Sequence, residues 1–135
     1  MPTWAKVLLI VLLVSFIGII GGVFMTYRWV KSNAGRIGGS IEEGKKFGKG
    51  KTVEQCVDAS LARMKGDFAE RLSTVAFNSA CLQNATDSAE ACAKIPSGII
   101  DRALWAKNKC SGQTDRQGCQ QIYQTVWQYC DSRSR

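Results

Sequence analysis

The sequence contains no histidine, which removes the commonest general base of enzymes, the Ser-His and Cys-His nucleophilic pairs, and imidazole metal ligation. It also lacks Cys-X-X-Cys, so neither a thioredoxin-like redox pair nor a zinc ribbon is indicated. The glycines of residues 35–50 do not follow a strand, as the glycines of phosphate-binding loops do. We therefore expect no enzymatic activity, and we predict no catalytic residue, no metal site and no cofactor.

The positive charge of the chain is concentrated in one short segment. The 135 residues include 18 Lys and Arg against 11 Asp and Glu. Residues 28–51 alone hold seven basic and two acidic side chains, whereas residues 52–135 hold ten and nine. A nucleic-acid-binding domain needs basic side chains clustered on one face. We therefore expect no nucleic-acid partner.

Residues 7–25 form an uncharged, strongly apolar run of 19 residues. As a helix the run is about 28 Å long, close to the thickness of a bilayer hydrocarbon core. Trp4 lies near one end, and Tyr27 and Trp29 lie near the other, where aromatic side chains favour the headgroup region. A cleaved signal peptide has a shorter apolar stretch with a cleavage site close behind it, and here Ser32-Asn33-Ala34 lies well beyond. The pattern predicts an N-terminal transmembrane anchor over residues 1–29.

Two glycines in the apolar run, Gly18 and Gly22, have the GxxxG spacing that lets membrane helices approach closely. This face is our prediction for helix packing in the membrane, and it allows a homo-oligomer through the anchor. Glycine is also common in membrane helices that do not pair, so the spacing is compatible with either a paired or an unpaired anchor.

Residues 30–51 are rich in glycine and lysine, and they connect the predicted anchor to the rest of the chain. Each glycine costs a helix about 1 kcal/mol, so the composition favours a flexible juxtamembrane linker. The alternative is a helix in which Gly35, Gly39, Gly44 and Gly48 form a small-residue stripe that packs against another helix.

The chain has six cysteines, all after the anchor: Cys56, Cys81, Cys92, Cys110, Cys119 and Cys130. An even number in so short a segment is typical of a disulfide framework in an oxidising compartment, where each bond adds about 2–4 kcal/mol. Positive charges flanking the anchor weakly favour a cytoplasmic C-terminal part, by a margin of one residue. We expect the C-terminal domain to be extracytoplasmic, either periplasmic or extracellular. Six buried thiols in a cytoplasmic bundle are the alternative.

Residues 52–135 show helical periodicity and no sustained two-residue alternation. A long helix is predicted from its cap at Thr52, with Gln55 completing a capping box, to about Gln83. A short helix then ends before Pro96, another covers about residues 97–110, and the last begins at Thr114. The predicted fold is all-α: one transmembrane helix followed by a small disulfide-braced bundle of three or four helices.

The predicted turns suggest one of the 15 ways in which six cysteines can pair. Cys81 and Cys92 flank one turn, and Cys110 and Cys119 flank another. Each of these pairs is placed to join neighbouring antiparallel helices. This scheme leaves Cys56 to pair with Cys130.

Four aromatic residues of the last two helices are candidates for a protein interface: Trp105, Tyr123, Trp127 and Tyr129. Tryptophan and tyrosine are enriched at interfaces, although core packing is the more frequent use in a small bundle.

Three functional classes remain open. The first is a non-enzymatic, membrane-anchored interaction module, an accessory subunit or adaptor with a protein partner in the envelope or membrane. The second is an extracytoplasmic ligand-binding domain with a small apolar pocket, for which the candidate lining residues are Met64, Phe68, Phe77, Leu104 and Trp127. The third is a cytoplasmic redox or metal sensor that uses its thiols.

Overall fold

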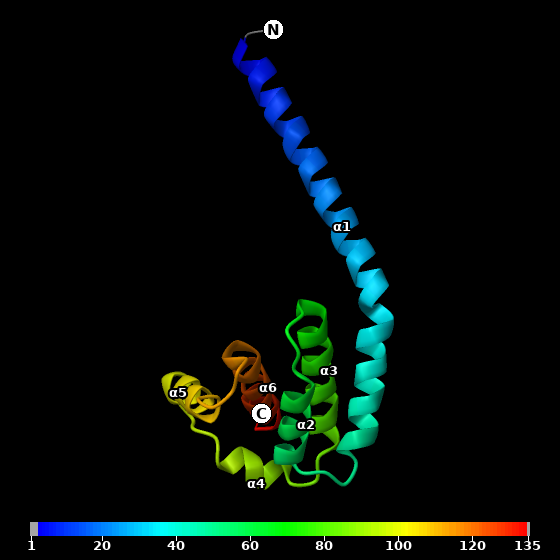
Figure 1. Ribbon diagram of the computed structural model, residues 1–135. Helices are drawn as coiled ribbons and strands as arrows, with labels where there is room; N and C mark the ends of the chain where they lie inside the picture. The colour runs from blue at the N-terminus through cyan, green and yellow to red at the C-terminus, as the bar shows by residue number, and fades with distance from the viewer. Residues whose placement is uncertain (1–2, 135) are drawn as a thin grey trace. The chain divides into compact units, whose positions relative to one another are not determined.

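The computed structural model describes residues 3–134, and the regular structure of this part of the chain is entirely helical (Figure 1). The all-α prediction is thus confirmed. Met1, Pro2 and Arg135, which belong to the predicted anchor and domain, lie outside the described residues. The six helices are α1 (Thr3–Gly48), α2 (Val53–Arg63), α3 (Phe68–Asn84), α4 (Ser88–Ala93), α5 (Ile99–Lys109) and α6 (Arg116–Arg133).

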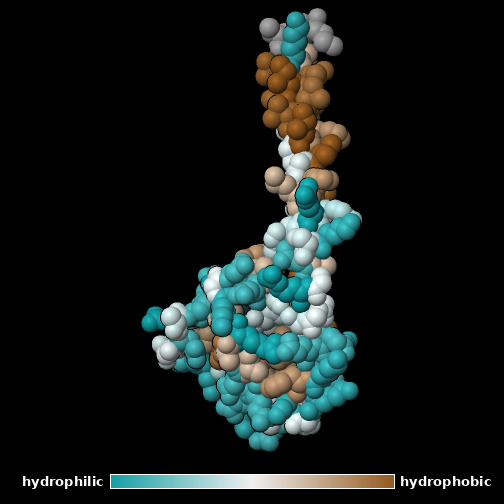
Figure 2. Space-filling view, turned by 45° about the vertical axis from the view of Figure 1, so that its right-hand side comes forward, coloured by the Kyte–Doolittle hydropathy of each residue, from teal (hydrophilic) through white to brown (hydrophobic). Residues whose placement is uncertain are grey.

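The chain divides into two compact units between Gly35 and Arg36. The first unit is the apolar part of α1, whose side chains are exposed and coloured hydrophobic in Figure 2. One 18-residue window has a mean hydropathy of 3.0, so the helix is long and apolar enough to cross a membrane. An N-terminal signal sequence can also meet this criterion of length and hydropathy. No atom of another residue approaches the faces of Gly18 and Gly22 within 4 Å, apart from their own helix, so this predicted packing face is uncovered.

The second unit is a bundle in which α6 is the central helix, with α2, α3, α4 and α5 packed against it. Its fully buried core includes Phe77 and Leu82 from α3 and Ile122 from α6. Val57 of α2 and Val126 of α6 complete the central contacts. The visible surface of the bundle is mostly hydrophilic, with a smaller apolar area (Figure 2).

The prediction of one continuous helix from Thr52 to about Gln83 is wrong, because this segment forms two helices, α2 and α3. The capping box at its start is confirmed, with Thr52 and Gln55 bonded reciprocally. Residues 64–67 separate the two helices, and the Asp67 carboxylate caps α3 by accepting a hydrogen bond from the Ala69 N–H. The break lets α3 fold back on α2, which brings Ser60 and Asn78 into a buried 3.1 Å contact.

The expected flexible linker also differs from the structure, because α1 continues to Gly48 and its last turns belong to the bundle. Gly44 and Gly48 lie directly against the α3 backbone. A Cβ atom on Gly44 would lie 2.3 Å from the Phe77 carbonyl oxygen, and one on Gly48 would lie 2.4 Å from that of Cys81. Close packing against α3 therefore outweighs the low helix propensity of glycine at these two positions. Gly35 and Gly39, the other members of the proposed stripe, meet nothing within 4 Å.

Polar contacts also attach the end of α1 to the bundle. The Ser40 and Ser73 hydroxyl groups form a hydrogen bond. The two terminal guanidinium nitrogens of Arg63 donate to the Glu43 carboxylate, one at 2.8 Å. The hydrogen bond from Arg63 lowers the pKa of Glu43, and the Arg63 guanidinium also lies 4.0 Å from the centre of the buried Phe77 ring.

Disulfide bonds join the helices of the bundle in a pattern that corrects two of the three predicted pairs. The bonds are Cys56–Cys81, Cys92–Cys130 and Cys110–Cys119. Only Cys110–Cys119 was predicted. In one continuous helix, Cys56 and Cys81 would be roughly 37 Å apart. Because α2 and α3 are separate and adjacent, their Cα atoms are 5.8 Å apart.

Candidate functional site

The described residues offer no cluster of metal ligands and no free thiol. Within residues 3–134 no group of three or more His, Cys, Asp or Glu side chains is placed to hold a metal ion. All six cysteines are in disulfides. A sensor based on free thiols needs cysteines that this arrangement does not supply.

The five residues predicted to line an apolar pocket are dispersed in the structure. Phe77 is fully buried in the core, whereas Phe68 and Leu104 are largely exposed. Met64 lies beside the α2–α3 connection and Trp127 beside α5, in two different surface depressions. The structure therefore does not assemble the predicted pocket.

The four predicted interface aromatics occupy three separate environments. Trp105 and Tyr123 contact each other edge to face, with ring centres 5.1 Å apart. Trp127 lies under the Arg102 guanidinium, 5.3 Å from its central carbon. Tyr129 accepts a 2.8 Å hydrogen bond from Arg133 near the end of α6. The Trp105–Tyr123 pair joins α5 to α6 and lines one depression, and Arg102 and Trp127 line a second depression between the same two helices.

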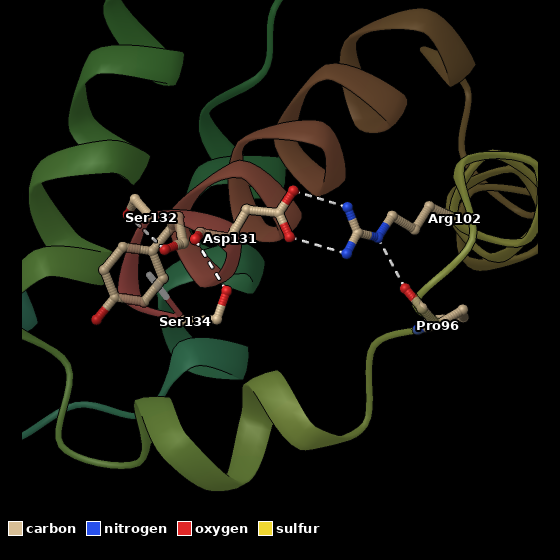
Figure 3. Close-up of polar contacts among 6 residues, drawn as sticks. Pro96, Arg102, Asp131, Ser132 and Ser134 are labelled. Atoms are coloured by element: carbon tan, nitrogen blue, oxygen red, sulfur yellow. Dashed lines mark hydrogen bonds and ion pairs between the residues drawn. The ribbon is translucent and has the colours of Figure 1, made fainter.

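Arg102 attaches α5 to the end of α6 (Figure 3). Its two terminal nitrogens donate to the two Asp131 carboxylate oxygens, each at 2.8 Å, and its Nε donates to the Pro96 carbonyl oxygen at 2.7 Å. The Cys110–Cys119 bond fixes the opposite end of α5. This helix is thus held at both ends.

The outer side of α5 exposes large apolar side chains, although α5 is firmly attached. The exposed fractions are 84% for Ile99, 75% for Ile100 and 52% for Leu104. We call these three residues the α5 patch. Leu104 was predicted to line an apolar pocket, and the structure shows that nothing in the described chain covers these three side chains to a large extent.

A groove between α2, α4, α5 and α6 has an apolar floor. Its volume is about 170 Å³. Val53 and Val57 of α2 and Val126 of α6 are buried at its base, and Trp105 and Tyr123 form one wall. Ala91 and Ile95 complete the apolar lining. We call this depression the Trp105 groove.

Charged side chains surround the Trp105 groove: Glu54, Asp87, Lys94 and Lys109. Asp87 accepts a 2.7 Å hydrogen bond from the Val53 N–H, so this carboxylate ties the start of α4 to the start of α2. Lys94 is paired with Glu90 at 2.9 Å. Glu54 and Lys109 have no ion-pair partner among the described residues.

The pKa of Tyr123 reflects both its burial and the charges near the Trp105 groove. Burial raises the pKa of its phenol above the ordinary value, and the nearby carboxylates of Asp58 and Glu54 raise it further. The Tyr123 phenol therefore lies within the electrostatic reach of two carboxylates of α2. The sequence identified Tyr123 as a candidate but gave no signal that α2 carboxylates lie near it, because they are about 65 residues away in the chain.

A larger depression of about 500 Å³ lies beside the α2–α3 connection and the start of α6. It is lined mainly by connecting residues, and its two charged groups, Arg71 and Asp115, are paired with each other at 3.2 Å. It lacks the buried apolar base of the Trp105 groove. The Trp105 groove, which has a buried apolar base, and the neighbouring α5 patch are the candidate binding surfaces considered below.

The residues that form these surfaces were only partly foreseen. Trp105 and Tyr123 were predicted as interface aromatics, whereas the roles of Arg102, Asp131, Glu54 and Lys109 depend on contacts between distant segments. No family model, no curated protein and no solved structure matches the chain.

Proposed function

We propose that this chain is a single-pass membrane protein that anchors a non-enzymatic interaction module outside the cytoplasm. In this proposal residues 7–25 span the bilayer, and the disulfide-bonded bundle binds another membrane or envelope protein as an accessory subunit or adaptor. The exposed α5 patch is the observation that carries the proposal.

The anchor and the compartment are supported by the apolar helix and by the disulfides. Residues 7–25 are uncharged and have the length of a bilayer core. Every cysteine has a disulfide partner within about 6 Å between Cα atoms, and such bonds persist in oxidising compartments. These features favour an extracytoplasmic bundle over the cytoplasmic location that the flanking charges weakly favour.

The binding role is supported by the α5 patch. Apolar side chains exposed together on a rigid element are typical of protein contact sites. Arg102 and the Cys110–Cys119 bond hold α5 in place, so its apolar side chains are presented without a large ordering cost. A free helix would lose more conformational entropy on binding.

Topology is tested by labelling intact cells with a membrane-impermeant maleimide, with and without an impermeant reductant. We expect labelling only after reduction, because an extracytoplasmic bundle has its six cysteines in disulfides. Labelling without reductant that requires permeabilised cells would place free thiols in the cytoplasm and contradict the proposal.

Partner binding is tested with a photo-crosslinking amino acid placed at Ile100 of the full chain in its native membrane. We expect a discrete adduct at Ile100 and none at Gln128, which is an exposed position of α6 outside the patch. Leu104→Ser should weaken the Ile100 adduct. Equal adducts at both positions, or none at either, would reject a specific interface at α5.

A further inference from the structure

We propose that the Trp105 groove receives one large apolar side chain of a protein partner, with a lysine or arginine beside that side chain facing Glu54 and Asp58. This inference rests on the proposed function, because it names a contact through which the interaction module recognises its partner. It concerns a different surface from the α5 patch.

The size of the groove limits what it accepts. Sites for drug-sized ligands and cofactors usually enclose about 300–1,000 Å³. The groove has a volume of about 170 Å³, which suits a single branched or aromatic side chain rather than a cofactor. Its base is formed by buried valines, so an inserted apolar group leaves water and contacts apolar atoms.

The Trp105–Tyr123 pair supplies a preformed wall for such a side chain. The two rings meet at 86°, and Trp105 belongs to α5, which is fixed by the Arg102 contacts and the Cys110–Cys119 bond. Tyr123 belongs to the central helix α6. A wall built from two fixed helices loses little conformational entropy when an anchor side chain enters.

The charges near the groove favour a basic neighbour on the partner. Glu54 and Asp58 lie one turn apart on α2, both are exposed, and neither has an ion-pair partner among residues 3–134. Lys94 is paired with Glu90 and also interacts with the charges of Glu54 and Asp87. The two cations near the groove, Lys94 and Lys109, are outnumbered by four carboxylates: Glu54, Asp58, Asp87 and Glu90. Negative charge is thus in excess, and charge complementarity selects a partner segment with Lys or Arg next to the inserted side chain.

The test uses the full chain in phosphatidylcholine nanodiscs, which carry no net charge to attract a basic peptide. The probes are three capped hexapeptides that differ only at two central positions, Leu-Lys, Ala-Lys and Leu-Glu. Binding is followed by NMR through the indole N–H of Trp105, and empty nanodiscs correct for adsorption to lipid.

We expect the Leu-Lys peptide to bind and to shift the Trp105 signal. Replacing its leucine by alanine should weaken binding about tenfold, because less apolar surface is buried. The Leu-Glu peptide should bind about threefold more weakly than the Leu-Lys peptide. The double variant Glu54→Gln, Asp58→Asn should bind the Leu-Lys peptide about threefold more weakly than the unmodified protein does. Ala91→Phe fills the groove and should abolish binding, whereas Ala93→Phe, on the exposed side of the same helix, should leave it unchanged.

Three results would overturn the inference: no Trp105 shift at millimolar peptide, equal binding of the Leu-Lys and Ala-Lys peptides, or equal effects of Ala91→Phe and Ala93→Phe. The crosslinking experiment at Ile100 shows whether only the groove inference fails or the proposed function fails as well. A specific adduct at Ile100 with an inert groove keeps the interaction module and rejects the groove as its contact.

Discussion

Arg102 and Asp131 form a bidentate ion pair that fastens α5 to the last turns of α6, with both nitrogen–oxygen distances at 2.8 Å (Figure 3). Only 17% of the Arg102 side chain is exposed, against 40% for Asp131. The pair therefore combines two parallel hydrogen bonds with partial shielding from water, which makes it stronger than an exposed ion pair.

Arg102→Lys should lower the free energy of unfolding by about 1–2 kcal/mol, because lysine keeps the charge but cannot form the two parallel bonds and the Pro96 bond together. The measurement is urea unfolding of the full chain in micelles, followed by circular dichroism. Lys94→Met is the matched control. It breaks the exposed pair with Glu90 and should leave the unfolding midpoint unchanged.

Gly44→Ala should destabilise the bundle by about 1–3 kcal/mol, because the added methyl group overlaps the α3 backbone. Gly39→Ala, in the same helix but with open space around it, should instead raise stability by about 0.5–1 kcal/mol through helix propensity. Thermal unfolding of the two variants gives the comparison. Equal shifts of the same sign would show that residues 36–48 do not pack as described.

Removing the disulfides one pair at a time should give losses that follow the length of the closed loop. The sequence separations are 25 for Cys56–Cys81, 38 for Cys92–Cys130 and 9 for Cys110–Cys119. Loop-closure entropy predicts losses of about 3.5, 3.9 and 2.6 kcal/mol for the corresponding double alanine variants. Peptide mapping of the non-reduced protein checks the pairing directly, and a Cys81–Cys92 peptide would contradict it.

Tyr123 should titrate above the ordinary tyrosine pKa of 10.0, because burial and the α2 carboxylates disfavour the phenolate. The native state then holds this proton more tightly than the unfolded state, so stability falls as the pH rises from about 10 through the native pKa. NMR titration of the Tyr123 ring carbon that bears the hydroxyl measures the shift. Glu54→Gln should lower this pKa, and an unchanged value would place Glu54 away from the groove.

Local features of the bundle could be predicted from the sequence. The capping box at Thr52 and Gln55 forms as expected, and the short helix before Pro96 and the helix ending at Cys110 are both present. The last helix begins at Arg116, two residues after the predicted start at Thr114, and Asp115 is its cap. These signals operate over three or four residues, so a single sequence contains them.

Contacts between distant segments could not be predicted in the same way. Periodicity continues through the α2–α3 connection, because the apolar faces of both helices point into one core. The prediction therefore placed Cys56 and Cys81 far apart, and the disulfide scheme derived from it was wrong for two pairs. Glycine propensity likewise predicted a flexible linker, since the α3 backbone that fits against Gly44 is more than 30 residues away.

The candidate site was the least predictable part of the molecule. Trp105 and Tyr123 were identified by residue type, but their pairing needs α5 and α6 to be adjacent. Leu104 was predicted to line a pocket and is instead exposed on α5 beside Ile100. Helical periodicity shows which side of a helix is apolar. It does not show whether the surface that covers this side belongs to the same chain.

Under the proposed extracytoplasmic location, the order of the disulfides along the chain would simplify oxidation during export. A polypeptide that emerges from its N-terminus exposes Cys56 and then Cys81, its native partner, before any competing cysteine. The other two bonds are nested in the sequence, because Cys110 and Cys119 both lie between Cys92 and Cys130. Cys110–Cys119 can therefore form before Cys130, the partner of Cys92, has emerged. In an exported chain, Cys56–Cys81 could thus form before the other cysteines emerge, whereas the remaining two bonds need the whole C-terminal segment.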